Sequence, residues 1–506
     1  MSAPAKILLT HSYHLGYDRK QMRKMQPYLP LGTLYAAALL RENGFQVSVF
    51  DAMLREPLEG FRDALRKQQP RIVVLYEDDF NFLTKMCLTR MRELAFFMME
   101  EARHIGARVI VHGSDATDHA REYLDRGCDF LLVGESETTL LHIVQELSAG
   151  REPSALPGVL RHAGQPVAEI SRVRRSRPVV SLPLPARDLI DVAPYREAWT
   201  AAHGSFSMNI VASRGCPFRC NWCAKPIFGD TYNVRDAAEV AEEMAILKNV
   251  YGAQHLWFAD DIFALSHAWV RAFSAEVQKR DAALPFKVQA RADLLDAETV
   301  ANLKRAGCAE IWMGVESGSQ AILDAMEKGL RLEDVSSARR NLREHGIRAC
   351  FFLQFGYPGE SWPDLQKTIQ LVRQLRPDDI GISFSYPLPD TRFYERVRSQ
   401  LGAKQNWSDS EDLCVMFKGA YADNFYRAVR DALHAEVDSW HSANGPASTA
   451  AEIQRLWREV DRLEPVSRNS DATEPWDAAS PLAASHVPRN SFIPLETFAA
   501  PQGRSK

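Results

Sequence analysis

The chain has 506 residues, enough for two or three domains that each have a hydrophobic core of their own. With 46% hydrophobic and 25% charged residues and a net charge of -4, it has an ordinary composition, which favours neither a nucleic-acid partner nor a membrane partner. No apolar run is long enough to cross a bilayer, and no export signal precedes the first predicted strand. Because three of its 8 cysteines cluster, we expect a reducing cytoplasm rather than a disulfide framework.

The first part of the chain, residues 1–146, alternates short β-rich runs with longer helical patterns. This alternation predicts an α/β fold, a Rossmann-like doubly wound parallel sheet with helices between its strands. Strands are predicted at 6–10, 46–50, 71–76, 108–112 and 130–133, and helices at 30–42, 58–67, 84–104 and from 137 onward.

Small and polar residues follow the predicted strands of this sheet, among them Gly113, Ser114, Gly134 and Glu135. Doubly wound sheets bind ligands beyond the carboxyl ends of their strands. A glycine there lets a bulky ligand approach the backbone. Each residue alone is an ordinary turn residue, but as a set they predict a ligand-binding edge.

Residues 147–204 are predicted to form a linker, because Pro and Gly interrupt any helical or strand pattern. Within it, residues 158–161 and 167–170 suggest a hairpin. Four arginines at 172, 174, 175 and 177 form the densest basic run. A solvated linker accounts for them, and we assign no nucleic-acid partner.

A strand predicted at 209–213 leads into a loop with Cys216, Cys220 and Cys223, a CxxxCxxC pattern. Three thiolates in a tight loop can hold a metal centre, and no fourth cysteine follows at ligand spacing. Because an iron–sulfur cube normally takes four thiolates, three would leave one iron open to another ligand. A closed zinc site needs four ligands, and a disulfide or free buried thiols fit the odd number and the polar context less well.

A second series of strands and helices over residues 205–398 predicts a partial (β/α)6 barrel. The further strands are predicted at 254–259, 287–290, 310–314, 349–354 and 380–384, with helices such as 237–250 and 332–345 between them. Polar residues gather in or after these strands, where barrels place their chemistry: Asp260, Asp261, Arg291, Glu316, Ser317 and Gln354. Any one could cap a helix. Together they suit a charged metabolite, with an acid for an ammonium group and an arginine for a carboxylate.

The last part of the chain turns helical and then loses its periodicity. Helices are predicted at 421–441 and 450–463 within a helical region over residues 399–464. Residues 465–506 are rich in Pro, Ser, Ala and Asn, which predicts a disordered tail.

Several motifs together resemble the radical S-adenosylmethionine (SAM) superfamily. They are the CxxxCxxC loop, FADDIF at 258–263, GVESGS at 314–319 and GYPGE at 356–360. With VGESE at 133–137 closing the first sheet, the layout over residues 6–397 is similar to the cobalamin-binding subgroup, the class B methyltransferases.

The resemblance implies roles for individual residues. Cys216, Cys220 and Cys223 would ligate a [4Fe-4S] cluster whose open iron chelates S-adenosylmethionine. Asp260 and Asp261 match positions near the methionine amino group, and Trp222 matches one near the adenine. The remaining matches, near the carboxylate and ribose, are Arg291, Glu316 and Ser317.

The implied reaction is methylation of an unactivated carbon of a specialised metabolite or lipid, through a 5′-deoxyadenosyl radical and methylcobalamin. The resemblance also implies an external reductant such as flavodoxin or ferredoxin. The DxHxxG motif that supplies a cobalt ligand elsewhere is absent at 12–16, as in many radical members of the group. A cyclase, oxidase or rearrangement enzyme with the same cofactors, or a non-catalytic iron–sulfur or zinc protein, are the alternatives.

Overall fold

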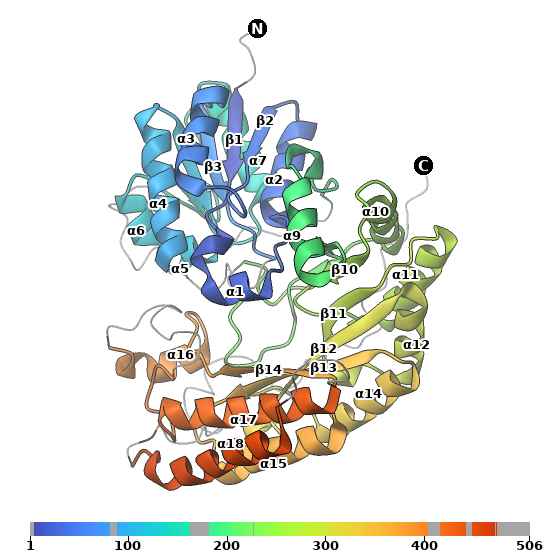
Figure 1. The fold of residues 1–506 in the computed structure, drawn as a ribbon. Coiled ribbons are helices and arrows are strands. Elements are labelled where there is room, and N and C mark those ends of the chain that lie inside the picture. The colour runs from blue at the N-terminus through green and yellow to red at the C-terminus, as the bar shows by residue number, and fades with distance from the viewer. Residues whose placement is uncertain are drawn as a thin grey trace.

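The computed structural model describes residues 5–80, 89–161, 182–225, 227–402, 415–441 and 448–470, and Ala472. Two sheets of six strands organise these residues, and they occupy separate halves of the molecule (Figure 1). The first half is drawn in blue and the second in green to red. The predicted α/β class is confirmed.

The first half begins with a parallel sheet. Its elements are β1 (Lys6–Thr10), α1 (Arg19–Lys24), α2 (Leu31–Glu42), β2 (Gln46–Phe50), α3 (Pro57–Gln68), β3 (Ile72–Tyr76), α4 (Thr89–His104), β4 (Arg108–His112), α5 (Ser114–Asp118), α6 (Ala120–Asp125), β5 (Phe130–Leu132), α7 (Glu137–Ser148) and β6 (Val159–Leu160).

The strands of this sheet follow the order β2-β1-β3-β4-β5-β6. The first five run parallel, and β6 pairs antiparallel with β5. Helices cover both faces, because β1, β3, β4 and β5 contribute alternate residues to two separate hydrophobic cores. One core contains α3, α4 and α6, and the other contains α2 and α7. The near-continuous apolar runs that predicted these strands are typical of such double burial.

The predicted linker is only partly a connector. Its predicted hairpin begins with β6, which pairs with β5, and the second predicted arm lies outside the described residues. A helix that the sequence pattern did not indicate, α9 (Ala193–His203), ends the segment. It packs through two buried aromatic residues: Tyr195 donates to Asp51 Oδ2 at 2.8 Å, and Trp199 Nε1 donates to the Pro27 carbonyl at 2.6 Å.

The second half contains a longer series of units. Its elements are β7 (Ser207–Ile210), β8 (Ser213–Arg214), β9 (Asn233–Val234), α10 (Ala237–Asn249), β10 (His255–Phe258), α11 (His267–Lys279), β11 (Phe286–Ala290), α12 (Ala297–Ala306), β12 (Cys308–Glu316), α13 (Gln320–Ala325), α14 (Leu332–Glu344), β13 (Arg348–Phe355), α15 (Trp362–Leu375), β14 (Asp379–Phe384), α16 (Arg392–Val397), α17 (Asp423–His441) and α18 (Ala450–Leu463).

Six strands of this half form a sheet in the order β14-β13-β12-β11-β10-β7, so that neighbours in space follow one another along the chain. All of them pair in parallel. The helices α10, α11, α12, α14 and α15 pack on one face, where alternate strand residues such as Phe258, Val288 and Phe351 are almost completely buried.

The opposite face of the second sheet is much less covered, and we call it the open face. Most of its side chains alternate with the helix-facing ones and are half-buried, and Ser383 is exposed, but Asn209, Cys350 and Gln354 on the same face are buried. The half-buried and exposed residues of the open face are Trp257, Lys287, Gln289, Glu310, Trp312, Phe352, Gly381 and Ser383.

The predicted C-terminal helices are present as α17 and α18, which pack on one another and extend the core of the second half. The residues just after α18 are ordered rather than disordered. Tyr421 donates to Glu464 Oε1 at 3.0 Å, and Asn469 Nδ2 donates to the Gly419 carbonyl at 2.7 Å. Most of the predicted tail lies outside the described residues. None of the helices described here is long and apolar enough to cross a membrane.

Candidate functional site

The cysteine loop leaves β8 and brings its three thiols toward a common space. All three are free and half-buried. Burial raises the pKa of Cys216 and raises that of Cys223 to about 12, and in both cases the neighbouring cysteines add to the effect. Within the described part of the chain, no three His, Cys, Asp or Glu side chains converge closely enough to hold a single metal ion.

Asn221 anchors the loop to the segment after α13. Its backbone N–H donates to the Met326 carbonyl at 3.1 Å, and its Nδ2 donates to the Ala325 carbonyl at 2.7 Å. Its Oδ1 accepts a hydrogen bond of 2.8 Å from the Tyr357 hydroxyl. These bonds hold the residue between Cys220 and Trp222 against the end of α13 and against Tyr357.

Lys225 and Gly215 hold the two ends of the loop. Lys225 Nζ donates to the Cys216 carbonyl at 2.8 Å, to the Phe218 carbonyl and to Asp230 Oδ1 at 2.7 Å. Gly215 has φ +79, and a Cβ at this position would lie 2.1 Å from the Thr231 carbonyl oxygen. Only glycine fits there.

Arg291, at the end of β11, lies against the loop. Its guanidinium carbon is 3.8 Å from the centre of the Phe218 ring. It donates twice to Asp293, at 2.9 Å each, and to the Lys328 and Gly329 carbonyls at 2.8 and 3.1 Å. Four of its five N–H groups are thus used within the described residues, and one is left for another acceptor.

The two neighbouring aspartates after β10 have different surroundings. Asp260 is buried, and its carboxylate accepts from the Ala212 N–H at 3.0 Å and from Ser213 Oγ at 2.5 Å. Burial raises the pKa of Asp260 to about 7. Asp261 is half-buried, and its charge contributes to the raised pKa of Cys216 and Cys223. Asp260 therefore supports the strand before the loop, whereas Asp261 lies near the thiols.

Glu316 is connected to the cysteine loop by Lys328, a residue that the sequence analysis did not single out. It has φ +62 beside a register shift in β12, and its carboxylate accepts from Lys328 Nζ at 2.8 Å in a buried ion pair. Lys328 Nζ lies 5.9 Å from the centre of the Trp222 ring, and the Cys220 thiolate contributes to the raised pKa of Lys328. The indole Nε1 of Trp222 is buried and has no hydrogen-bond partner in the described structure.

Two predicted residues bond within the chain instead. Ser317 Oγ lies 3.3 Å from Thr368 Oγ1 on α15 and accepts from the Ser319 N–H at 3.1 Å. Gln354 Nε2 donates to Ser385 Oγ at 3.0 Å, which joins β13 to the residue after β14. The structure thus brings Asp261, Arg291, Glu316 and Trp222 to the cysteine loop and directs Asp260 and Ser317 toward structural bonds.

The carboxyl edge of the first sheet carries the small residues Gly113, Ser114 and Gly134, which we call the cradle. Gly113 has φ +151, and a Cβ there would lie 2.8 Å from Glu77 Cγ. Ser114 Oγ is buried without a hydrogen-bond partner among the described residues. The Gly134 carbonyl accepts from His112 Nε2 and from Ser136 Oγ, both at 2.8 Å. A buried hydroxyl with no partner beside a position that cannot carry a side chain fits a large polar ligand.

Arg214, two residues before Cys216, joins the two edges. Its Nη1 lies 2.7 Å from Glu137 Oε1 and 3.3 Å from Glu135 Oε2, and all three side chains are buried. Its guanidinium also lies over the rings of Tyr35 and Phe80, at 5.2 and 5.1 Å. The strand that leads into the cysteine loop, β8, is therefore held against the edge that carries Gly134 and Glu135.

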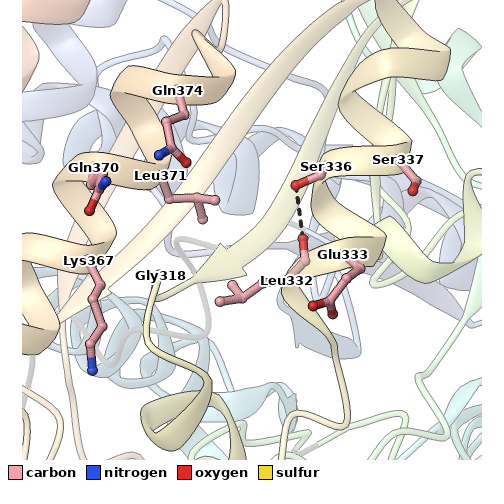
Figure 2. A pocket seen from close by; sticks show the side chains of 9 residues that line it. All are labelled: Gly318, Leu332, Glu333, Ser336, Ser337, Lys367, Gln370, Leu371 and Gln374. Carbon is pink, nitrogen blue, oxygen red and sulfur yellow. Dashed lines mark hydrogen bonds between the residues drawn. The ribbon is translucent and has the colours of Figure 1, made fainter.

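A shallow groove of about 470 Å³ lies elsewhere, between α14 and α15 (Figure 2). Polar side chains line most of it, and Ser336 Oγ donates to the Leu332 carbonyl of its own helix at 3.2 Å. None of the predicted site residues lines it. Its lining consists of Gly318, Leu332, Glu333, Ser336, Ser337, Lys367, Gln370, Leu371 and Gln374.

Comparison with known families agrees with this geometry. Residues 210–372, which contain the cysteine loop and β10 to β13, match the radical SAM superfamily. The chain therefore contains a radical SAM domain. The predicted radical SAM domain is confirmed.

Relatives extend the likeness beyond the radical SAM domain. An uncharacterized methyltransferase from Pyrococcus horikoshii is 26% identical over 390 residues, which cover 75% of this chain and 80% of the relative. The cobalamin- and cluster-bound structure of TsrM, a radical S-adenosylmethionine methyltransferase from Kitasatospora setae, aligns with a TM-score of 0.64 at 21% identity and covers 80% of this chain and 76% of that one. The cobalamin-dependent radical enzyme OxsB aligns with a TM-score of 0.58 at 18% identity over 78% of this chain and 54% of that one. Both halves of the molecule thus share the fold of cobalamin-dependent radical SAM proteins.

Proposed function

We propose that the chain is a cobalamin-dependent radical SAM methyltransferase that methylates an unactivated carbon of a small molecule, such as a specialised metabolite or lipid. The observation that carries the proposal is the Arg214 contact, because it holds the cysteine loop against the edge with Gly113, Ser114 and Gly134. Two cofactors at these edges would face one another. The Pyrococcus methyltransferase and the TsrM and OxsB folds support the same proposal.

We propose the following domain boundaries for this enzyme. We assign a Rossmann-like cobalamin-binding domain to residues 1–146, a linker to 147–204 and a partial (β/α)6 barrel to 205–398. A helical region over 399–464 and a tail over 465–506 complete the chain. The consecutive strand order of the second sheet supports the barrel, because a barrel adds its strands in chain order.

Cys216, Cys220 and Cys223 would hold a [4Fe-4S] cluster, which leaves one iron for S-adenosylmethionine. When bound, the cluster and cobalamin supply the electron that cleaves S-adenosylmethionine and the methyl group that is transferred. Asp261 would accept from the methionine ammonium group, and the N–H of Arg291 that no described residue accepts would donate to the carboxylate. An external reductant such as flavodoxin or ferredoxin would deliver electrons in a reducing cytoplasm.

The residues of the chain contribute by holding the cofactors and the substrate in fixed positions. The loop is fixed by Asn221 and Lys225, and the indole N–H of Trp222 bonds to none of the residues that the structure describes. Lys328 places a positive charge beside Trp222 and Cys220. A radical formed a few ångströms from its intended place reacts with the wrong bond, so this rigidity serves selectivity.

The test is anaerobic purification with iron, sulfide and cobalamin present. Optical and paramagnetic resonance spectra should show both a [4Fe-4S] cluster and bound cobalamin. Mass spectrometry of reactions with S-adenosylmethionine should find 5′-deoxyadenosine together with S-adenosylhomocysteine, because one molecule starts the radical and another resupplies the methyl group. 5′-Deoxyadenosine without S-adenosylhomocysteine would instead indicate a cyclase, an oxidase or a rearrangement enzyme. Neither product from loaded protein would indicate a non-catalytic cluster protein.

A further inference from the structure

The open face carries a lysine whose charge is not compensated. Strand register places Lys287 directly beside Trp257 on one neighbouring strand and beside Glu310 on the other. Parallel partners project to the same side of a sheet, so all three side chains lie on the open face. Lys287 makes no hydrogen bond or ion pair with any residue that the structure describes. Its ammonium lies 5.8 Å from the ring centres of both Tyr28 and Trp257, and the charges of Glu310 and Lys24 act on it from a greater distance than an ion pair.

Glu310 is the nearest candidate counter-ion, but other groups already use its carboxylate. Its Oε1 accepts from Trp312 Nε1 at 2.8 Å, and its Oε2 lies 3.4 Å from Arg348 Nε. Burial lowers the pKa of Lys287, as expected when desolvation outweighs the attraction of Glu310. A half-buried ammonium whose contacts are ring faces retains a strong preference for an added anion.

An aromatic surface lies next to this ammonium. The rings of Trp312 and Phe352 are stacked, with centroids 4.7 Å apart and planes 27° apart. A Cβ on Gly381 would lie 3.2 Å from both rings, so the glycine lets them lie flat across three strands. Both rings are half-buried, and solvent therefore reaches part of the stack. A planar group can stack there.

The same strand links this surface to the cysteine loop. Lys287 and Gln289 project from β11 onto the open face, and Arg291 follows at the end of the strand beside Phe218. At about 3.3 Å per residue, Lys287 and Arg291 are separated by about 13 Å along the strand. A ligand that reaches from the ammonium toward the cysteine loop is therefore an extended molecule rather than a single small acid.

We propose that the substrate is an aromatic carboxylate whose ring system stacks on Trp312 and Phe352, whose carboxylate pairs with Lys287 and whose far end reaches the cysteine loop. The inference rests on the proposed function only in calling this ligand the substrate. The charge of the ammonium selects an acid, and the flat exposed rings select an aromatic acid over an aliphatic one.

Binding of three small probes to the full-length, anaerobically reconstituted protein tests the proposal. The probes are 2-naphthoate, its neutral analogue 2-naphthamide, and the non-aromatic cyclohexanecarboxylate, each titrated by calorimetry. We expect naphthoate to bind about tenfold more tightly than either of the others. Lys287→Gln should remove the preference for naphthoate over naphthamide, and Lys287→Arg should keep it. Lys279→Gln, at an exposed lysine on α11, is the matched control and should change nothing.

Equal binding of naphthoate and naphthamide by the unaltered protein would overturn the proposal, as would a Lys287→Gln variant that keeps the preference. Thermal unfolding of Lys287→Gln checks its fold, and we expect no loss of stability because the substitution removes a poorly compensated charge. The proposed function is judged separately, by the formation of 5′-deoxyadenosine and S-adenosylhomocysteine. A protein that binds naphthoate selectively but forms neither product would contradict the function while leaving the binding site intact.

Discussion

The two sheets of the molecule are both parallel, yet they bury their faces differently. The first has helices on both faces and contributes to two hydrophobic cores, so only its carboxyl edge remains for a ligand. The second has helices on one face only, and its other face carries half-buried aromatic and charged side chains. The first sheet can therefore bind a ligand only at its carboxyl edge, whereas the second can bind one at its carboxyl edge and on its open face.

The largest expected effect is at the edge of the second sheet. Cys223→Ser should lower the formation of 5′-deoxyadenosine by roughly 1000-fold or more, because the thiolates act as a unit. Iron analysis and product mass spectrometry check this. Cys128→Ala, within a core of the first sheet, is the control and should retain iron and turnover. Normal iron content and turnover in Cys223→Ser would mean that no cluster is bound at this edge.

Adjacent phenylalanines on β13 test the difference between the two faces directly. Phe351 faces the helices and is fully buried, so Phe351→Ala should lower the free energy of unfolding by about 3–5 kcal/mol. Phe352 lies on the open face, and Phe352→Ala should cost about 1 kcal/mol. Urea unfolding of both variants measures the difference. Equal costs would mean that the open face is packed as tightly as the other.

The two edges also differ in the pH at which buried acids affect stability. Burial raises the pKa of Glu360, after β13, to about 8, and that of Asp78, after β3, to about 6. A carboxyl with a raised pKa stabilises the fold below its ordinary pKa, and this contribution is lost as pH rises through the raised value. The free energy of unfolding should therefore fall, on the order of a few kcal/mol, between about pH 5 and 8.

Two substitutions distinguish the contributions of Glu360 and Asp78 to this pH dependence. Glu360→Gln should flatten the dependence up to about pH 8, and Asp78→Asn should flatten only its part below about pH 6. Urea unfolding at intervals of one pH unit measures both. A Glu360→Gln protein with the full slope of the unaltered protein would assign the loss to other groups.

The smallest expected effect is at the edge of the first sheet. Gly113→Ala should weaken cobalamin binding by about tenfold, because a Cβ would press on Glu77 and shift the cradle. Equilibrium dialysis with hydroxocobalamin measures this. Gly106→Ala is the matched control: it has φ +78, but no atom lies within 4 Å of the added Cβ. If both variants bind alike, the edge around Gly113 does not contact cobalamin.

Much of the fold follows from local patterns. Strands such as β1, β2 and β4 have the predicted bounds, because each is a short run rich in Ile, Val, Leu or Phe that contrasts with its flanking residues. The helix α9 was missed because its buried face consists of only Tyr195 and Trp199 within a segment interrupted by prolines.

The site was predictable as a set of residues but not as a set of contacts. The cysteine spacing and the residues after each strand indicate where the chemistry gathers. Whether Asp260 turns to the Ser213 hydroxyl or to a ligand depends on the neighbouring backbone, which no spacing records. Lys328 and Arg214 were missed for a related reason: Arg214 meets Glu137 across 77 positions of sequence.

The Arg214 contact has a consequence for how the protein is made. The ribosome synthesises Glu135 and Glu137 well before Arg214, the residue that pairs with both. Until Arg214 is available, the first domain has two unpaired acidic groups at an edge where the folded protein buries them. Burying unpaired charges is costly, so this edge reaches its folded structure only after β8, which carries Arg214, has been synthesised. A fragment that ends before Arg214, or a hybrid whose first domain comes from a relative with another residue at this position, would thus have a loosened edge even though its helices and strands were intact.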